Sequence, residues 1–227
     1  MNQLRVVCVY LGMMVRSLLI LVTTSLLTGC SVFGIRSGYE QPSYVLLETL
    51  SDQIELRHYA PRLAVETTVD IPDYDEGRNA AFRPLFDYIS GANRTNESVA
   101  MTAPAEAALT SEEVSMTVPV ETSRAGGGGM RMRFFLPAEF TLETAPQPID
   151  PKVHLIEVAG QLQAVLRFSG FASEDAIAKR TKDLLRALDQ SSWRAASEPM
   201  TYSYDPPWTI PFFRRNEIVI PVFPASS

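Results

Sequence analysis

The side chains best suited to chemistry in this 227-residue sequence are few and lie far apart. It has two histidines, His58 and His154, and two cysteines, Cys8 and Cys30. A catalytic site needs a nucleophile with a nearby base or paired carboxylates, and a metal site needs a cluster of ligands. The spacing of these residues shows neither arrangement, so the sequence favours ligand binding over catalysis. Acid–base catalysis by glutamate and tyrosine stays open, because the sequence does not show which of these side chains meet.

Cys30 follows a segment with the properties of an export signal. Residues 6–27 are largely apolar, but Arg16 lies in their middle, where a charge costs about 2.5 to 3.5 kcal/mol in a spanning helix. A signal peptide explains the segment better, with Arg5 and Arg16 in its basic region and an apolar region of suitable length after them. We expect residues 1–29 to be removed, whether translation begins at Met1 or at an internal methionine such as Met13 or Met14.

The end of this segment, Leu27-Thr28-Gly29-Cys30, resembles the lipobox of bacterial lipoproteins. The resemblance implies cleavage before Cys30 and acylation of its sulfur and of its new amine. Several acyl chains, at about 0.8 kcal/mol per buried methylene, would anchor the protein to a membrane. Ser31 after the cysteine is typical of lipoproteins that are sent to the outer membrane. The expected location is therefore the cell envelope, on the periplasmic side of the outer membrane.

Charge and cysteine content restrict the partners of the remaining chain. Loss of the two signal arginines takes the formal net charge from −6 to −8, and a negative chain repels nucleic acid. No disulfide is expected, because Cys8 leaves with the signal and Cys30 carries lipid. We expect residues 30–43 to form a lipidated tether and residues 44–224 to form one folded domain.

Alternating hydrophobicity predicts strands along most of this domain. In residues 54–59 the alternation places His58 on the apolar face of a strand. Residues 63–69 repeat the pattern, and Ala60-Pro61 between the two runs predicts the turn of a hairpin. The run Gly126 to Gly129 predicts a hairpin loop rather than a phosphate cradle, because no Lys-Ser or Lys-Thr follows it. Further strands are expected at Val99 to Ala103, Val114 to Val120, Met130 to Leu136, Val153 to Val158, Gln163 to Phe168, Met200 to Tyr204 and Glu217 to Val222.

Two segments have helical spacing instead. The first apolar stripe consists of Phe82, Leu85, Phe86 and Ile89, and the second of Ile177, Thr181, Leu184 and Leu188. Gly91 stands where the first helix should end, and Pro84 is expected in its first turn. Ser173 is expected to cap the second helix. Strands followed by a helix, twice over, predict an α+β fold.

Four separated blocks resemble the SOUL heme-binding family. They are Ile54-Glu55-Leu56-Arg57-His58-Tyr59-Ala60-Pro61, the stretch from Phe82 to Asn93, Met101-Thr102-Ala103-Pro104, and Tyr204-Asp205-Pro206-Pro207-Trp208 with Arg214-Arg215-Asn216-Glu217. Together they extend over nearly all of residues 44–222. The resemblance implies two pseudo-symmetric halves, whose antiparallel strands curl into a distorted barrel with two flanking helices, as in the gyrase-inhibitor-like effector-binding fold.

The resemblance also implies a site for heme or a related tetrapyrrole. Such a site needs an apolar slot, an axial ligand and a partner for the propionates. His58 matches the position of a histidine ligand assigned in some family members, which makes it the first candidate for contact with the heme iron, at an apolar cavity inside the curved sheet. Met101 could line or ligate, although packing in the core is the commoner role of such a methionine. Arg214 and Arg215 could pair with propionates, although a structural salt bridge to Glu217 or a neighbour is the stronger expectation.

The sequence therefore predicts a lipid-anchored protein that binds heme or another planar hydrophobic ligand. Two alternatives stay open. One is a small-molecule hydrolase or tetrapyrrole-modifying enzyme on the same fold, and the other is an envelope scaffold that binds no heme. A membrane contact is expected only through the lipid, and no protein partner is indicated.

Overall fold

The structure is a computed structural model that describes residues 34, 36–95 and 111–225. Its strands are β1 (Tyr44–Ser51), β2 (Ile54–Tyr59), β3 (Arg62–Val69), β4 (Asn93–Arg94), β5 (Val120–Arg124), β6 (Met130–Phe135), β7 (Gln147–Pro148), β8 (His154–Val158), β9 (Gln161–Phe168), β10 (Trp193–Ala195), β11 (Met200–Ser203) and β12 (Asn216–Pro224). Its helices are α2 (Tyr74–Ile89) and α3 (Glu174–Asp189), with short 3-10 turns η1 (Gly126–Gly128) and η2 (Pro211–Phe213). The expected α+β plan is confirmed.

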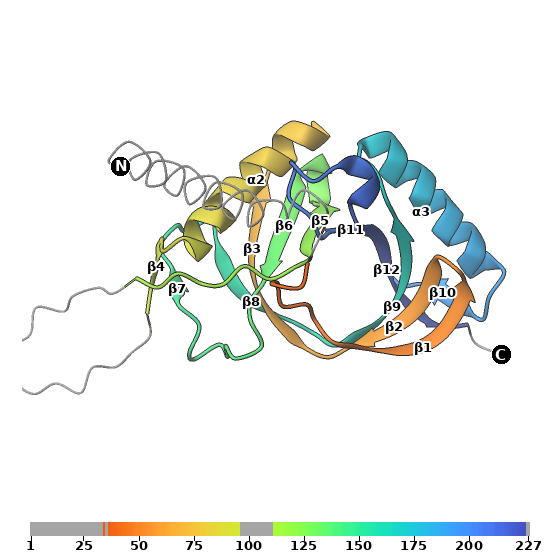
Figure 1. The fold of residues 1–227 in the computed structure, drawn as a ribbon, viewed down its shortest axis with the longest axis horizontal. Helices are drawn as coiled ribbons and strands as arrows, with labels where there is room; N and C mark the ends of the chain where they lie inside the picture. Colours follow the sequence, from red (N-terminus) through yellow and green to blue (C-terminus); the bar gives the residue numbers. More distant parts are fainter. Residues whose placement is uncertain (1–33, 35, 96–110, 226–227) are drawn as a thin grey trace, which may run out of the picture.

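One large antiparallel sheet forms the body of the domain. Its strands run in the order β1-β2-β9-β12-β11-β5-β6-β3-β8, β10 pairs with β12, and β4 and β7 form a small separate pair. The sheet curves strongly, and both helices lie on its outer side (Figure 1). It does not close into a barrel, because β1 and β8 are edge strands at the two ends of this order. The last strand of the chain, β12, lies in the interior of the sheet.

The predicted hairpin of β2 with β3 is wrong. In the structure β2 pairs with β1 and β9, whereas β3 pairs with β6 and β8. At Ala60-Pro61 the chain therefore passes from one half of the sheet to the other instead of turning back. The neighbouring connection at Gly160 passes between the halves in the opposite direction, since Tyr59 faces Gln161 and Arg62 faces Val158. The chain therefore crosses between the halves twice, at Ala60-Pro61 and at Gly160, and the two crossings connect the halves covalently.

Each helix covers one half of the sheet from outside. Helix α2 packs on β3 and β6, where Val65, Leu85 and Met132 belong to one buried apolar cluster. Helix α3 packs on β9, β10 and β12, where Leu184 and Ile218 belong to a second cluster. A third cluster fills the inside of the curve and contains Ala64, Val118, Phe135, Val158, Val165, Met200, Tyr202, Tyr204 and Val219.

Helix α2 begins earlier than its apolar stripe indicates. Asp73 caps it by accepting a 2.8 Å hydrogen bond from the backbone nitrogen of Glu76, so Pro84 lies inside the helix and not in its first turn. Phe82 and Phe86 stay exposed and stack on each other, with ring centroids 5.7 Å apart. Leu85 and Ile89 of the expected stripe do face the sheet, together with Ala81 and Tyr88. Gly91, with a φ of 105°, follows the end of the helix as expected.

The other expectations are largely met where the structure describes them. The hydroxyl of Ser173 caps α3 by accepting from the nitrogen of Ala176, and Leu184 and Leu188 are buried. The glycine run joins β5 to β6 in an antiparallel hairpin. The strand expected at Val114 to Val120 is wrong for most of its length, since β5 begins only at Val120. The strand expected at Val99 to Ala103 lies outside the described residues.

Residues 36–41 pack against the domain, although they were expected to belong to a tether. Arg36 makes a 2.7 Å ion pair with Asp205, whose side chain is 2% exposed. The Glu40 carbonyl oxygen accepts a hydrogen bond from the nitrogen of Val118, and its carboxylate accepts one from the nitrogen of Ala138. The domain therefore holds its N-terminal segment from at least Arg36 onward.

Candidate functional site

His58 lies exposed on the outer face of β2. It shares that face with Leu56, but Leu56 is buried under α3, whereas His58 stands nearer the end of the strand. The inside of the curve holds a buried apolar cluster of the sheet's own side chains, on the face opposite to His58. The expectation that His58 opens on an enclosed apolar cavity is therefore wrong. Ligation of heme by this exposed imidazole stays a prediction, and Met101 lies outside the described residues.

Arg214 holds the loop that precedes β12. Its guanidinium donates hydrogen bonds to the carbonyl oxygens of Thr209, at 2.8 Å, and of Pro207. It also lies over the ring of Phe171, 4.8 Å from the ring centroid. These contacts give Arg214 a structural role, and they place it away from Arg215, which points into a different group of residues.

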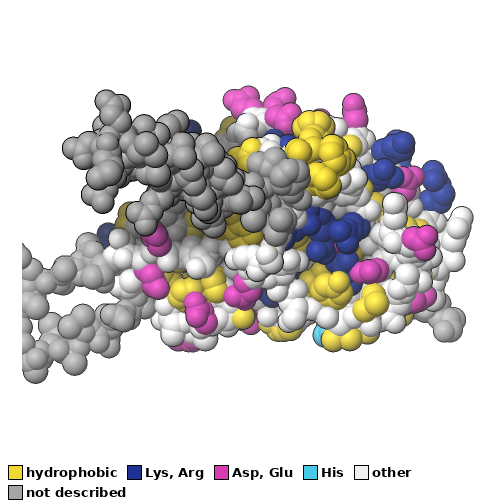
Figure 2. All heavy atoms as spheres, viewed as in Figure 1, with side chains coloured by type: hydrophobic (Ala, Val, Ile, Leu, Met, Phe, Trp, Pro, Cys, Tyr) yellow, Lys and Arg dark blue, Asp and Glu magenta, His cyan; other side chains and the backbone are white. Residues whose placement is uncertain are grey.

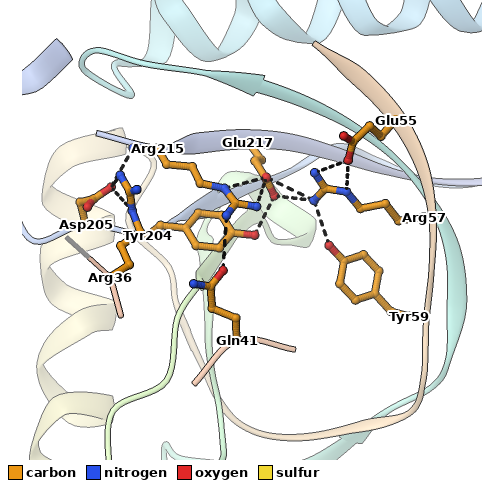
Figure 3. A network of polar contacts seen from close by, with 9 residues as sticks. All are labelled: Arg36, Gln41, Glu55, Arg57, Tyr59, Tyr204, Asp205, Arg215 and Glu217. Atoms are coloured by element: carbon orange, nitrogen blue, oxygen red, sulfur yellow. Dashed lines mark hydrogen bonds and ion pairs between the residues drawn. The ribbon is translucent and has the colours of Figure 1, made fainter. Parts of the chain in front are cut away.

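Arg215 belongs to a buried polar network around Glu217 inside the curved sheet (Figure 3). The Glu217 carboxylate, with no exposed surface, accepts hydrogen bonds from Arg57 at 3.2 Å, from Arg215 at 2.7 Å and from the hydroxyl of Tyr204 at 2.7 Å. Arg57 also donates to the Tyr59 hydroxyl and pairs with Glu55. The expected salt bridge from Arg215 to Glu217 is present.

Burial and the neighbouring charges of this network shift the pKa values of its members. Burial alone would lower the pKa of Arg57, but the Glu217 carboxylate, followed by Tyr59, raises that pKa above its ordinary value. Burial and the same carboxylate raise the pKa of Tyr204 well above the usual range, so its hydroxyl stays a donor. Two arginines on one buried glutamate are already partnered, which leaves Arg215 poorly suited to bind propionates.

A polar hollow lies at one end of the inner face of the sheet. It has a volume of about 550 Å³, and its lining includes Glu66, Ser123, Arg131 and Glu198. Nearby, Arg133 pairs with Glu66 at 2.6 Å and with the buried carboxylate of Glu121 at 2.8 Å. Charged walls of this kind disfavour an apolar macrocycle, because burial of unpaired polar groups is costly.

A second pocket, the helix groove, runs between α2 and α3 over the outer faces of β5 and β11, and Figure 1 shows the two helices on either side of these strands. Its volume is about 430 Å³, within the range of small-molecule sites. Apolar surface dominates its lining, which includes Tyr74, Arg124, Met130, Ile177, Ala178 and Lys182. Among the two pockets, this one has the apolar character that a planar hydrophobic ligand requires.

Three side chains give the helix groove its chemistry. Arg124 pairs with Glu174 at the start of α3, and its Nη1 donates to the carbonyl oxygen of Pro72. Lys182 is exposed on α3 and, like Arg124, lines the groove. Carboxylates of a bound ligand could therefore reach both Arg124 and Lys182. Burial raises the pKa of the Tyr74 phenol, partly offset by a hydrogen bond with Thr122, so tyrosinate is disfavoured there.

Sequence reasoning missed the helix groove because its residues come from α2, β5, β6, α3 and β11, which no local pattern brings together. His154 is exposed on β8, opposite Glu66.

In residues 36–95 and 111–225, no group of three or more histidine, cysteine or acidic side chains is arranged to hold a metal ion. No helix among the same residues has the length and hydropathy needed to cross a membrane.

Two curated mammalian proteins are similar to this chain in sequence. The human protein named Heme-binding protein 2 is 29% identical over 119 residues, which cover 52% of this chain and 53% of that protein. The chain thus matches only about half the length of this relative. The mouse protein of the same name is 26% identical over 184 residues, with coverage of 79% of this chain and 84% of the relative.

Solved structures share the fold at low sequence identity. The EcmrR C-terminal domain matches with a TM-score of 0.56 at 10% identity, covering 76% of this chain and 98% of the domain. An uncharacterized conserved protein from Listeria innocua matches with a TM-score of 0.51 at 13% identity, covering 75% of this chain and 92% of that protein. These matches establish the fold and carry nothing about the ligand.

The family assignment rests on the sequence itself. The family model described as SOUL heme-binding protein matches residues 39–221, which include β1 to β11 and most of β12. Heme is accordingly the ligand that the family and the two relatives indicate. The chain belongs to the SOUL heme-binding protein family.

Proposed function

We propose that this protein is a lipid-anchored binding protein of the cell envelope that holds heme, or a related planar tetrapyrrole, in the helix groove. The observation that carries the proposal is the apolar lining of this groove, which opens between the two helices and has cationic side chains beside it. A macrocycle needs an apolar slot, and its propionates need cations, and the groove offers both.

Arg124 and Lys182 are the residues that would hold the propionates. Arg124 would exchange its pairing with the exposed Glu174 for a pairing with the ligand, which costs little because a surface ion pair is weak. Ile177 and Ala178, on the face of α3 turned to the groove, would contact the macrocycle.

The helix groove offers no strong ligand for heme iron. The Met130 side chain is 1% exposed and belongs to the core under α2, and the raised pKa of Tyr74 keeps its phenol protonated at neutral pH. When bound, heme would supply an iron centre, while the protein residues supply apolar contact and propionate pairing. We therefore expect affinity to depend on the groove and the cations rather than on His58, which is exposed on β2 outside the groove lining.

The proposed lipid anchor is Cys30. The lipobox-like sequence that ends at Cys30 supports acylation of this cysteine, and Ser31 supports transport to the outer membrane. The domain would then face the periplasm. The negative charge of the chain supports a partner other than nucleic acid.

A heme titration of the chain from Ser31 onward tests the ligand and its place. All the described strands and helices lie between Tyr44 and Pro224, so this chain contains the whole sheet. We expect a stoichiometric shift of the Soret band that Ala178→Trp, which fills the groove, weakens about tenfold or more. Lys179→Trp is the matched control, because Lys179 is exposed on α3 and does not line the groove.

The same titration separates the two heme sites under consideration. If His58→Ala abolishes the spectral shift while Ala178→Trp leaves it intact, heme binds on β2 and the groove proposal is wrong. If neither variant changes a shift that the parent chain shows, both sites are excluded. Absence of any shift in the parent chain would remove heme as the ligand.

A further inference from the structure

A cluster of exposed aromatic side chains lies on the loops that precede α3 and β12. We call it the aromatic patch, and it consists of Phe171, Trp208, Phe212 and Phe213, whose exposed fractions are 63%, 66%, 67% and 41%. Three of them belong to the loop between β11 and β12, which contains η2. In Figure 2 hydrophobic side chains gather on the visible face over this loop. Large exposed apolar groups that cluster mark an interaction surface more often than they arise at random.

The patch is held in place by the fold. The nitrogen of Gly170 donates a 2.9 Å hydrogen bond to the carbonyl oxygen of Pro211, which joins the β9–α3 loop that carries Phe171 to η2. The rings of Phe212 and Phe213 have centroids 4.4 Å apart. Arg214 links the two segments, since it lies over Phe171 and donates to carbonyl oxygens of its own loop. These contacts hold the two loops that carry the four aromatic side chains of the patch.

The patch adjoins the place where the N-terminal segment reaches the domain. The Arg36 guanidinium donates a 2.8 Å hydrogen bond to the carbonyl oxygen of Phe213. A methyl group built on Gly34 would lie only 2.7 Å from the same oxygen, so Gly34 touches the patch. Cys30 lies four positions before Gly34 in the sequence, a reach of at most about 14 Å. A lipid on Cys30 therefore keeps the patch within about that distance of the bilayer surface.

The chemistry of the patch matches the polar border of a bilayer. Tryptophan and phenylalanine side chains partition to the boundary between headgroups and acyl chains. Arg214 lies among them and, within the residues that the structure describes, makes no ion pair with a carboxylate. Its charge is therefore available to headgroup phosphates, even though the chain as a whole is negative.

We propose that the aromatic patch docks the domain on the lipid bilayer that holds the Cys30 anchor, so that the domain lies on the membrane surface in one orientation. This inference rests on the lipid anchor of the proposed function. A second copy of the chain is the competing occupant of the patch. The short reach from Cys30 favours the bilayer, because the anchor places lipid beside the patch.

The two tryptophans allow a direct test. Trp208 belongs to the patch, whereas Trp193 lies in β10 and donates from its indole nitrogen to Glu48. The lipidated chain, purified from a Gram-negative host, would be reconstituted in phosphatidylethanolamine and phosphatidylglycerol vesicles with or without brominated acyl chains. In the Trp193→Phe variant, which keeps only Trp208, we expect brominated lipid to quench the emission. In the Trp208→Phe variant, which keeps only Trp193, we expect no quenching.

Two further measurements keep the outcomes distinct. Mass spectrometry of the purified chain reports whether Cys30 is acylated; an unmodified cysteine refutes the anchor. Acylation with equal quenching of both tryptophans refutes docking alone and leaves the anchor and heme binding standing. Phe212→Ser with Phe213→Ser should abolish the quenching of Trp208, whereas Phe223→Ser, at an exposed aromatic in β12, should not. Conversion of a dimer to a monomer by the double variant, seen in sedimentation without vesicles, would assign the patch to a second copy.

Discussion

The Tyr204 hydroxyl donates a 2.7 Å hydrogen bond to Oε2 of Glu217 in the interior of the curved sheet, where both side chains are buried. Without this hydroxyl, the buried Glu217 carboxylate accepts one hydrogen bond fewer. We expect Tyr204→Phe to lower the free energy of unfolding by about 1.5 to 3 kcal/mol, the range for hydrogen bonds to charged groups. Urea unfolding followed by circular dichroism measures the change. A loss below the effect of a surface Tyr39→Phe control would contradict the importance of this bond.

Glu217→Gln tests the network more severely. The substitution keeps the shape of the side chain but leaves Arg57 and Arg215 without their buried counter-charge. Breaking a buried pair in this way costs about 3 to 5 kcal/mol. Glu55→Gln is the matched control, because Glu55 also pairs with Arg57 but is 34% exposed, and a surface pair contributes about 0 to 1 kcal/mol. Equal losses for the two variants, measured by urea unfolding, would show that the network around Glu217 is not a stabilising centre.

Four buried tyrosines and the half-buried Tyr74 predict a loss of stability at high pH. Burial is the first cause that raises the pKa of Tyr59, Tyr74, Tyr88, Tyr202 and Tyr204 in the folded protein. In the unfolded chain a tyrosine titrates near pH 10, so between that pH and the raised value the unfolded state releases protons that the folded state keeps. Stability is therefore fully present below about pH 10 and falls as the pH rises further.

Absorbance of tyrosinate, compared with circular dichroism during an alkaline titration, checks this expectation. The four buried phenols and the half-buried phenol of Tyr74 should ionise only together with unfolding. Ionisation of all tyrosines near pH 10 without any loss of structure would refute it.

Gly77 allows helix α2 to approach the sheet closely. A methyl group on Gly77 would lie 2.9 Å from the carbonyl oxygen of Ile71 and 3.2 Å from Cβ of Met130. Alanine favours a helix over glycine by about 1 kcal/mol, but overpacking of a core costs about 1 to 3 kcal/mol. We expect Gly77→Ala to destabilise the protein and, because Met130 lies in the helix groove, to weaken heme binding. Gly38→Ala, at a site with open space around it, should change neither thermal stability nor heme affinity.

Local patterns in the sequence predicted the strands and helices better than their partners. The cap at Ser173 and the apolar stripe of α3 depend on neighbours in the chain, and the structure has both. The connection at Ala60-Pro61 was predicted to be a turn because proline and short length suit one, but strand pairing is decided by distant residues such as Gln161 and Val158. Phe82 and Phe86 fitted a helical stripe, yet both are exposed and stack on each other, although the Phe82 ring also meets the buried Phe134 edge-on.

The candidate site was less predictable than the fold. Arg57 and Tyr59 stand beside His58 in the same strand, and their burial inside the curve depends on Glu217, which is 160 residues away from Arg57. Alternation alone placed the apolar members of β2 correctly on one face, but it could not show that the opposite face is also covered. The helix groove requires knowledge of how two helices flank β5 and β11, which no single segment encodes.

The place of β12 in the sheet has a consequence for the order of assembly. This strand, the last of the chain, pairs with β9, β10 and β11, so it joins the two halves at their common centre. Until it is available, β9 and β11 each lack a partner, and the contacts that complete the sheet span long stretches of sequence. Chains with such distant pairings fold slowly. A polypeptide from which β12 has not yet emerged therefore lacks the strand that completes its core.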